Sequence, residues 1–172
     1  MRQGMLLTRR SVTGGLAAAA VIALGGCSRS PGEQQQAAKR QPSSSPPQLA
    51  AMTVYRDPSC GCCQAWAAIA RTAGYQVTVI DRTDMPAIKL RYGVPKELES
   101  CHTTTVGNYA VEGHVPLELV GKLLVEKPAD VRGIAVPGMP AGSPGMEVPD
   151  GTKQPFQVMA FDSAGRISPF RA

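Results

Sequence analysis

Three of the five cysteines in the chain, Cys60, Cys62 and Cys63, lie within four consecutive positions between Asp57 and Trp66. Thiolate sulfur is both a nucleophile and a ligand for soft metals, so these cysteines suit Cu(I), Zn(II) or an iron–sulfur centre. Cys60 and Cys63 also have the Cys-x-x-Cys spacing of thiol–disulfide exchange chemistry. The residues alone leave three interpretations open: a metal site, a redox pair with Cys60 as nucleophile and Cys63 as resolver, and a structural disulfide.

These cysteines are expected on a turn between a strand and a helix. Residues 52–55 are apolar or β-branched, which favours a strand, and residues 65–70 favour a helix that ends near Gly74. The free amide groups and the dipole at the start of a helix lower the pKa of a nearby thiol. The predicted position therefore favours thiolates, which both metal binding and redox chemistry require.

A further thiol, Cys101, opens a strand predicted over residues 101–106. Cys101 could supply a fourth sulfur to the cysteine cluster, resolve a disulfide with one of its members, or be a buried free cysteine. Neighbouring side chains in a strand point to opposite faces, so His102 should point away from a site that Cys101 faces. We therefore expect His102 to be a hydrogen-bonded structural residue, and an additional metal ligand only if a bulge intervenes.

Three more side chains are candidates for additional metal ligands. His114 lies in a loop and is interpreted either as an exposed loop residue or as a copper ligand. Met139 and Met146 share a loop rich in glycine and proline over residues 136–151. Their thioethers suit Cu(I), although methionine is equally a packing residue that adapts to irregular gaps. Trp66 is expected to pack in the core.

The remaining pattern predicts an α/β domain with the thioredoxin-like order β-α-β-α-β-β-α, in which the cysteines occupy the first strand-to-helix junction. The first two strands are expected to be parallel. Asp84 is expected to cap the second helix and Gly93 to end it. A closing hairpin is more than a minimal thioredoxin needs. After the first strand and helix, the predicted strands cover residues 75–80, 101–106 and 109–112, the helices 84–92 and 116–126, and the closing hairpin 156–161 with 166–168.

The N-terminal region predicts export rather than fold. Arg9 and Arg10 resemble a twin-arginine signal, and the apolar run that follows them is too short to span a bilayer as a mature helix. Cys27 directly follows this run in a lipobox-like sequence, so we expect it to be lipidated and to begin the mature protein. The predicted organisation is an export signal over residues 1–26, a disordered linker over 27–50 and one domain over 51–172, on the periplasmic or extracellular face of a membrane.

The net charge of +5 does not indicate a nucleic-acid partner. Six basic residues and one acidic residue precede Ala51, whereas twelve of each follow from Ala51 onward. The predicted domain therefore has no net positive charge with which to attract a phosphate backbone.

Four ordered blocks of sequence resemble the CopG-type family of exported copper-resistance proteins, which is distinct from the ribbon-helix-helix repressor of the same name. The resemblance covers nearly all of residues 52–161. The blocks are Tyr55–Cys63, Ser100–Thr103, Glu112–Pro116 and Ala135–Glu147.

The resemblance implies a thioredoxin-like fold and copper binding through Cys60, Cys62, Cys63 and Cys101. It also implies a role in handling toxic copper outside the cytoplasm, with copper or thiol redox chemistry coupled to binding, and other exported copper-handling proteins as partners. We therefore expect a copper-binding protein that holds Cu(I), in one or several ions, on the cysteine cluster. The alternative is a thiol–disulfide oxidoreductase that uses Cys60 and Cys63, in which Cys62 would be surplus.

Overall fold

A computed structural model describes residues 49–171, which fall within one compact unit, Ser43–Ala172. The predicted export signal over residues 1–26, the predicted lipidation site Cys27 and residues 27–48 of the predicted linker lie outside the described residues. Among the residues described, no helix combines the length and the apolar character needed to cross a membrane.

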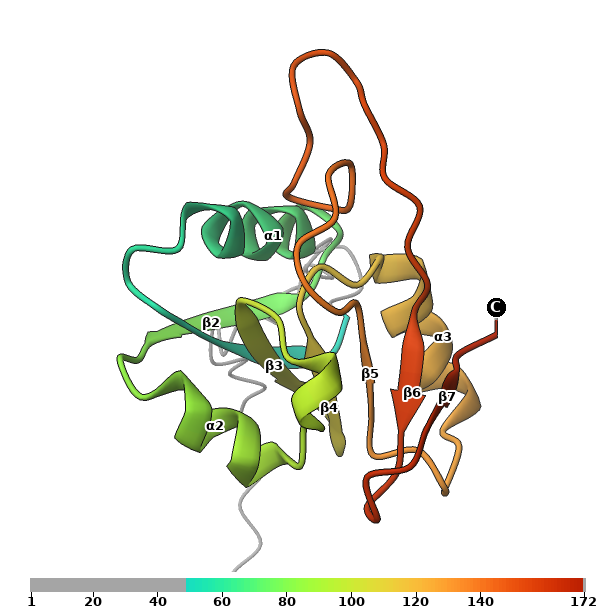
Figure 1. Cartoon of the computed structure of the whole chain (residues 1–172). Helices are drawn as coiled ribbons and strands as arrows, with labels where there is room; N and C mark the ends of the chain where they lie inside the picture. The colour runs from blue at the N-terminus through green and yellow to red at the C-terminus, as the bar shows by residue number, and fades with distance from the viewer. Residues whose placement is uncertain (1–48, 172) are drawn as a thin grey trace, which may run out of the picture. The chain divides into compact units, whose positions relative to one another are not determined.

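The described residues form a mixed α/β fold in which three α-helices flank a seven-stranded sheet (Figure 1). The strands follow the order β2-β1-β3-β4-β5-β6-β7 across the sheet. The β1–β2 and β4–β5 pairs are parallel, and the other neighbouring pairs are antiparallel. The elements are β1 Ala51–Arg56, α1 Gly61–Thr72, β2 Gln76–Asp81, α2 Met85–Tyr92, the 3-10 turn Lys96–Leu98, β3 His102–Val106, β4 Tyr109–Glu112, α3 Leu117–Glu126, β5 Gly133–Ala135, β6 Met159–Phe161 and β7 Ile167–Pro169.

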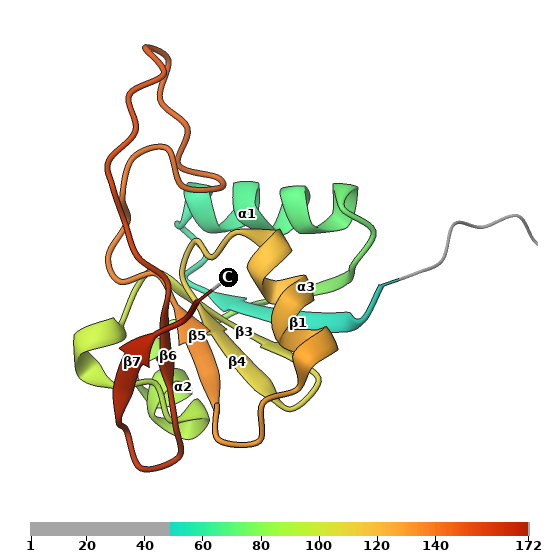
Figure 2. The same cartoon turned by 90° about the vertical axis from the view of Figure 1, so that its right-hand side faces the viewer.

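The sheet separates two apolar clusters because successive side chains of a strand point to opposite faces. Helices α1 and α3 cover the face with the larger cluster, and α2 covers the other (Figure 2). In β4, for example, Val111 packs in the larger cluster and the preceding Ala110 in the smaller one. The sheet is therefore buried on both sides near its centre, which fixes its register.

Most predicted elements are confirmed to within a few residues, including the parallel β1–β2 pair, the β3–β4 hairpin and the closing β6–β7 hairpin. The structure differs from the expectations in two places. The short strand β5 was not expected, yet it joins β4 to β6 and so makes the closing hairpin part of the same sheet. Asp84 precedes α2 as predicted but makes no side-chain cap, because its carboxylate accepts hydrogen bonds from Arg82 instead. Gly93 ends α2 with a left-handed φ of 72°, as predicted.

Candidate metal centre

Three cysteines lie at the N-cap and in the first turn of α1, where several hydrogen bonds hold the backbone. The sulfur of Cys60, the N-cap residue, accepts a hydrogen bond from the Cys63 amide at 3.3 Å, which occupies one of the free donors of the helix start. Ahead of it, the Asp57 carboxylate accepts a hydrogen bond from the Ser59 amide at 2.8 Å. Arg56 donates to the Cys60 carbonyl at 3.0 Å. These bonds hold the cysteine turn at the end of β1.

The register of the sheet brings Cys101 to this turn. Arg56, the last residue of β1, pairs with His102, the first residue of the antiparallel strand β3. Cys101 lies in the bend directly before β3, so it comes level with the cysteines that follow β1. The sulfur atoms of the four cysteines Cys60, Cys62, Cys63 and Cys101 all lie within 4.8 Å of one another.

The four sulfurs are not equivalent. Cys60 and Cys63 form a disulfide, whereas Cys62 and Cys101 are free thiols. The Cys62 sulfur lies 3.5 Å from that of Cys60. Burial, together with the neighbouring Cys62, raises the pKa of the Cys101 thiol to about 12. Cys101 is therefore protonated near neutral pH in this state, and a soft metal that binds it must displace the proton.

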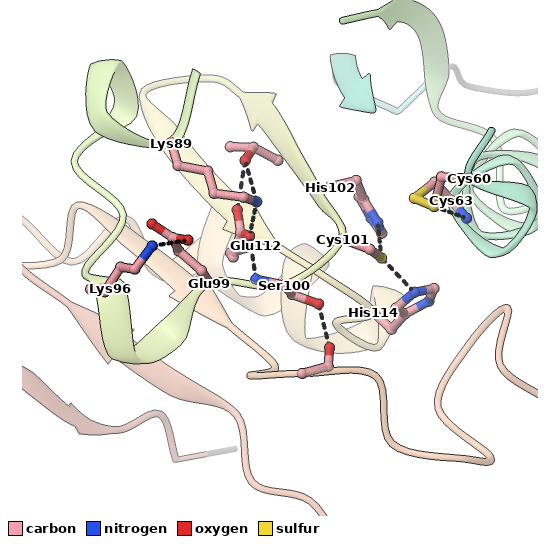
Figure 3. A network of polar contacts seen from close by, with 12 residues as sticks. Cys60, Cys63, Lys89, Lys96, Glu99, Ser100, Cys101, His102, Glu112 and His114 are labelled. Carbon is pink, nitrogen blue, oxygen red and sulfur yellow. Dashed lines mark hydrogen bonds and ion pairs between the residues drawn. A yellow bond between two sulfur atoms is a disulfide. The ribbon is translucent and has the colours of Figure 1, made fainter. Parts of the chain in front are cut away.

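Two histidines also lie beside Cys101. The Cys101 sulfur is 3.3 Å from Nδ1 of His102 and 3.0 Å from Nε2 of His114 (Figure 3). Candidate ligand atoms of these three residues form a second group within 4.8 Å. The alternation argument for His102 does not apply, because Cys101 lies in a bend and not in the regular strand. The interpretation of His114 as an exposed loop residue was wrong, since its side chain is fully buried.

The hydrogen bonds of His114 define its tautomer. Its Nδ1 lies 2.7 Å from the carbonyl oxygen of Pro144, which can only accept, so Nδ1 carries the proton. Its Nε2 therefore directs a lone pair toward the Cys101 sulfur. Burial lowers the pKa of both His114 and His102, so both imidazoles are neutral, which is the form that binds metals. His102 Nε2 is buried and has no hydrogen-bond partner among the described residues.

Trp66 supports both histidines from α1. It is fully buried, as predicted, and its ring centroid lies 5.0 Å from that of His102, which in turn lies 5.1 Å from that of His114. The indole Nε1 donates to the Val115 carbonyl at 3.0 Å, next to His114 in sequence. The tryptophan thus joins α1 to the loop that carries His114.

The loop after β5 lies against α1 beside the site. A Cβ placed on Gly145 would come within 2.8 Å of the Trp66 amide nitrogen and 3.1 Å of the Cys62 carbonyl oxygen. This close approach holds Pro144 where its carbonyl can meet His114. Sequence reasoning missed the Pro144 contact, because a backbone carbonyl has no residue signature. In the same loop, Met139 is 53% exposed and Met146 is half-buried.

Comparisons with known proteins identify the family. A family model described as a protein of unknown function, DUF411, matches residues 98–146, which include Cys101, both histidines and both loop methionines. No curated protein matches the chain. The solved structure of copper resistance protein CopG, form 2, is 43% identical in sequence to this chain. The match covers 71% of this chain and 96% of the CopG chain, with a TM-score of 0.66. The solved structure of form 1 is also 43% identical; the match covers 70% of this chain and 94% of the CopG chain, with a TM-score of 0.65. Because it covers nearly the whole of these structures at this identity, the chain belongs to the CopG copper resistance protein family.

Proposed function

We propose that this protein binds Cu(I) on the sulfur atoms of Cys60, Cys62, Cys63 and Cys101 and thereby contributes to copper resistance. The observation that carries the proposal is that all four sulfurs lie within 4.8 Å of one another. Thiolates are the ligands that Cu(I) prefers, and each can bridge two ions. Four sulfurs at this spacing suit a multinuclear centre, and the solved relatives named as copper resistance proteins support copper as the metal.

His114 and His102 are proposed as additional ligands, because their neutral ring nitrogens lie 3.0 Å and 3.3 Å from the Cys101 sulfur. Met139 and Met146 are proposed to meet Cu(I) on its way to the cysteines, since both lie in the loop that borders the site. Copper is the cargo in this proposal, and the donors change from thioether to thiolate along the route.

Copper binding is proposed to be coupled to thiol redox chemistry. With the Cys60–Cys63 disulfide formed, only Cys62 and Cys101 are free thiols. A thiol reductant that delivers two electrons and two protons converts this disulfide into two thiols, which completes the four-sulfur set. The second candidate function rests on the same disulfide: a thiol–disulfide oxidoreductase with Cys60 as nucleophile and Cys63 as resolver, in which Cys62 has no role.

The setting of this chemistry is also proposed. The strands β2, β1, β3 and β4 with α1, α2 and α3 are interpreted as a thioredoxin-like unit, to which β5, β6 and β7 add. The twin-arginine-like start and the lipobox-like Cys27 suggest an exported protein anchored to the periplasmic or extracellular face of a membrane. Other exported copper-handling proteins would then deliver or receive the metal, and no nucleic acid is involved.

Single serine variants of the four cysteines test the proposal against the oxidoreductase. In a bridged cluster every sulfur matters, so Cys62→Ser and Cys101→Ser should each lower Cu(I) affinity at least about tenfold, as should Cys60→Ser and Cys63→Ser. Anaerobic Cu(I) titration of the reduced protein measures affinity and stoichiometry, and a disulfide-reductase assay runs in parallel. Ser59→Ala is the matched control, because Ser59 lies in the same turn but carries no sulfur.

Two results decide between the functions. Wild-type Cu(I) binding by Cys62→Ser and Cys101→Ser, with reductase activity lost only in Cys60→Ser and Cys63→Ser, would establish the oxidoreductase. Loss of Cu(I) affinity in all four variants, with Ser59→Ala unchanged, would support the cluster.

A further inference from the structure

A buried ion pair lies behind the segment that carries Cys101. Lys89 on α2 is 5% exposed, Glu112 at the end of β4 is fully buried, and the lysine Nζ is paired with Oε1 of the glutamate. A buried ion pair is weak evidence for stability, because removing two charges from water offsets much of their attraction. The other hydrogen bonds of the Glu112 carboxylate therefore say more about its role than the ion pair does.

Glu112 accepts two further hydrogen bonds, and both come from residues next to the site. The Ser100 amide donates to Oε1 at 2.6 Å, and the Thr103 hydroxyl donates to Oε2 at 2.6 Å. Lys89 also donates to the Thr103 hydroxyl at 3.4 Å. Burial raises the pKa of Glu112, and the ammonium of Lys89 together with these donors opposes that effect.

The position of these contacts in the chain links them to the site. Ser100 immediately precedes Cys101, and Glu112 lies two residues before His114, so one carboxylate ties together the two segments that carry these side chains (Figure 3). The residue between Glu112 and His114 is Gly113, which has φ +71°, and a Cβ there would collide with the side chain of Ser100. Glycine thus allows the two segments to meet.

The same small region also anchors the loop after β5. The Ser100 hydroxyl donates to the carbonyl of Gly138, and the Gly138 amide donates to the Glu99 carbonyl at 3.5 Å. The amide of Val136 donates to the Glu112 carbonyl at 3.0 Å. Ser100 therefore connects the carboxylate on one side to the loop with Met139 and Pro144 on the other.

We propose that Glu112, backed by Lys89, is a positioning residue for the metal centre: its carboxylate holds the Ser100 amide and thereby sets the place of the Cys101 sulfur. Neither Lys89 nor Glu112 is among the candidate ligands. Glu112 acts through the backbone amide of Ser100, and Lys89 acts through the side chains of Glu112 and Thr103. This inference rests on the proposed copper function, for which it explains how the sulfur of a single cysteine outside the Cys-x-Cys-Cys turn is held within 4.8 Å of the other three.

Two double variants separate positioning from charge balance. Lys89→Met with Glu112→Gln removes both charges but keeps a side-chain oxygen that can accept from the Ser100 amide. Lys89→Met with Glu112→Leu removes both charges and that acceptor. Neither variant leaves a buried charge without its partner. The comparison therefore isolates the hydrogen bond to Ser100 from the burial of ions.

The measurements are Cu(I) affinity of the reduced protein and, without metal, the rate at which iodoacetamide modifies Cys101 relative to Cys62. We expect the glutamine double variant to bind Cu(I) within about threefold of wild type and the leucine double variant to bind about ten- to a hundred-fold more weakly, as for other residues that orient metal ligands. Cys101 should be modified several-fold faster in the leucine variant, since its segment is released.

The proposal is overturned if the two double variants match in both readouts. If wild-type protein binds no Cu(I), the proposed function fails, and the Cys101 modification rate alone then decides whether Glu112 positions this segment. If the leucine variant does not fold, Lys89→Met with Glu112→Met takes its place, because methionine has nearly the shape of glutamate and lacks the oxygen that accepts from the Ser100 amide. This variant should bind Cu(I) at least about tenfold more weakly than the glutamine double variant, and binding within about threefold of it would refute the proposal.

Discussion

Gly145→Ala tests whether the loop after β5 holds the site together. Gly145 has φ +82°, where an L-residue costs about 1–2 kcal/mol, part of which is offset because alanine has fewer conformations in the unfolded chain. Its Cβ would also meet the Trp66 amide nitrogen at 2.8 Å and the Cys62 carbonyl at 3.1 Å. These are backbone atoms of α1 that cannot rotate away, so the loop must lift.

Lifting the loop separates Pro144 from His114. The imidazole Nδ1–H would lose its 2.7 Å hydrogen bond while its ring remains in a buried site, and an unsatisfied buried donor costs about 1–3 kcal/mol. Gly151→Ala is the matched control, because Gly151 has φ +73° in the same loop but has no atom near a Cβ. The control has the same backbone strain without the steric contacts, so the lost hydrogen bond should destabilise Gly145→Ala by about 1–3 kcal/mol more than Gly151→Ala.

Thermal unfolding of the metal-free protein measures this difference, which corresponds to a gap in Tm of roughly 4–12 °C between the two variants. Nitrogen NMR of His114 provides the second readout. The Pro144 carbonyl keeps the proton on Nδ1, so loss of this contact should allow the proton to move to Nε2. Equal melting temperatures for the two variants, with the Nδ1–H tautomer retained in Gly145→Ala, would refute the argument that the loop fixes His114.

Two further predictions follow from the histidines and from the N-terminal region. Because burial lowers the pKa of His102 and His114 in the folded protein, the unfolded chain binds more protons below its own histidine pKa of about 6.5. The free energy of unfolding of the metal-free protein should therefore fall as pH drops below that value, and His114→Gln should make this decrease smaller. Urea unfolding between about pH 7 and pH 5.5 measures the decrease. An equal decrease in wild type and His114→Gln would contradict the prediction. Cys27→Ala should shift the protein from the membrane fraction to the soluble fraction or leave the signal uncleaved, whereas a soluble wild-type protein whose mature form begins elsewhere by intact mass would contradict the lipoprotein prediction.

The sequence predicted the cysteine turn well because its determinants are local. An apolar β-branched run, a cluster of small residues and Gly74 specify β1, α1 and the position of Cys60 between them. The approach of Cys101 was also foreseeable once the first and third strands were recognised. Strand β5 was not foreseeable, since three residues, Gly133–Ala135, give too short a pattern and are held by their neighbours on both sides.

The environment of the histidines was the part that sequence could not supply. His102 was assigned by strand alternation, but the strand begins one residue later than predicted, and Cys101 is left in a bend where alternation does not operate. His114 was expected to be exposed because it lies in a loop, but this loop packs against Pro144 and Trp66. Glu112 gave a signal that was not used: a carboxylate in a strand predicted next to the core requires a buried partner, and Lys89 provides it.

The division of the site between local and non-local residues determines how the proposed copper binding would depend on folding. Cys60, Cys62 and Cys63 lie in one turn, so even an unfolded chain keeps three sulfurs close together, whereas Cys101 joins them only through the pairing of β1 with β3. A metal that bound only the turn would bind folded and unfolded chains alike and add little stability. A metal that also binds Cys101 distinguishes the two states. In the proposed function, the pairing of β1 with β3 and the bonds that Glu112 and the loop after β5 make to the bend before β3 would thus connect copper binding to the folded protein.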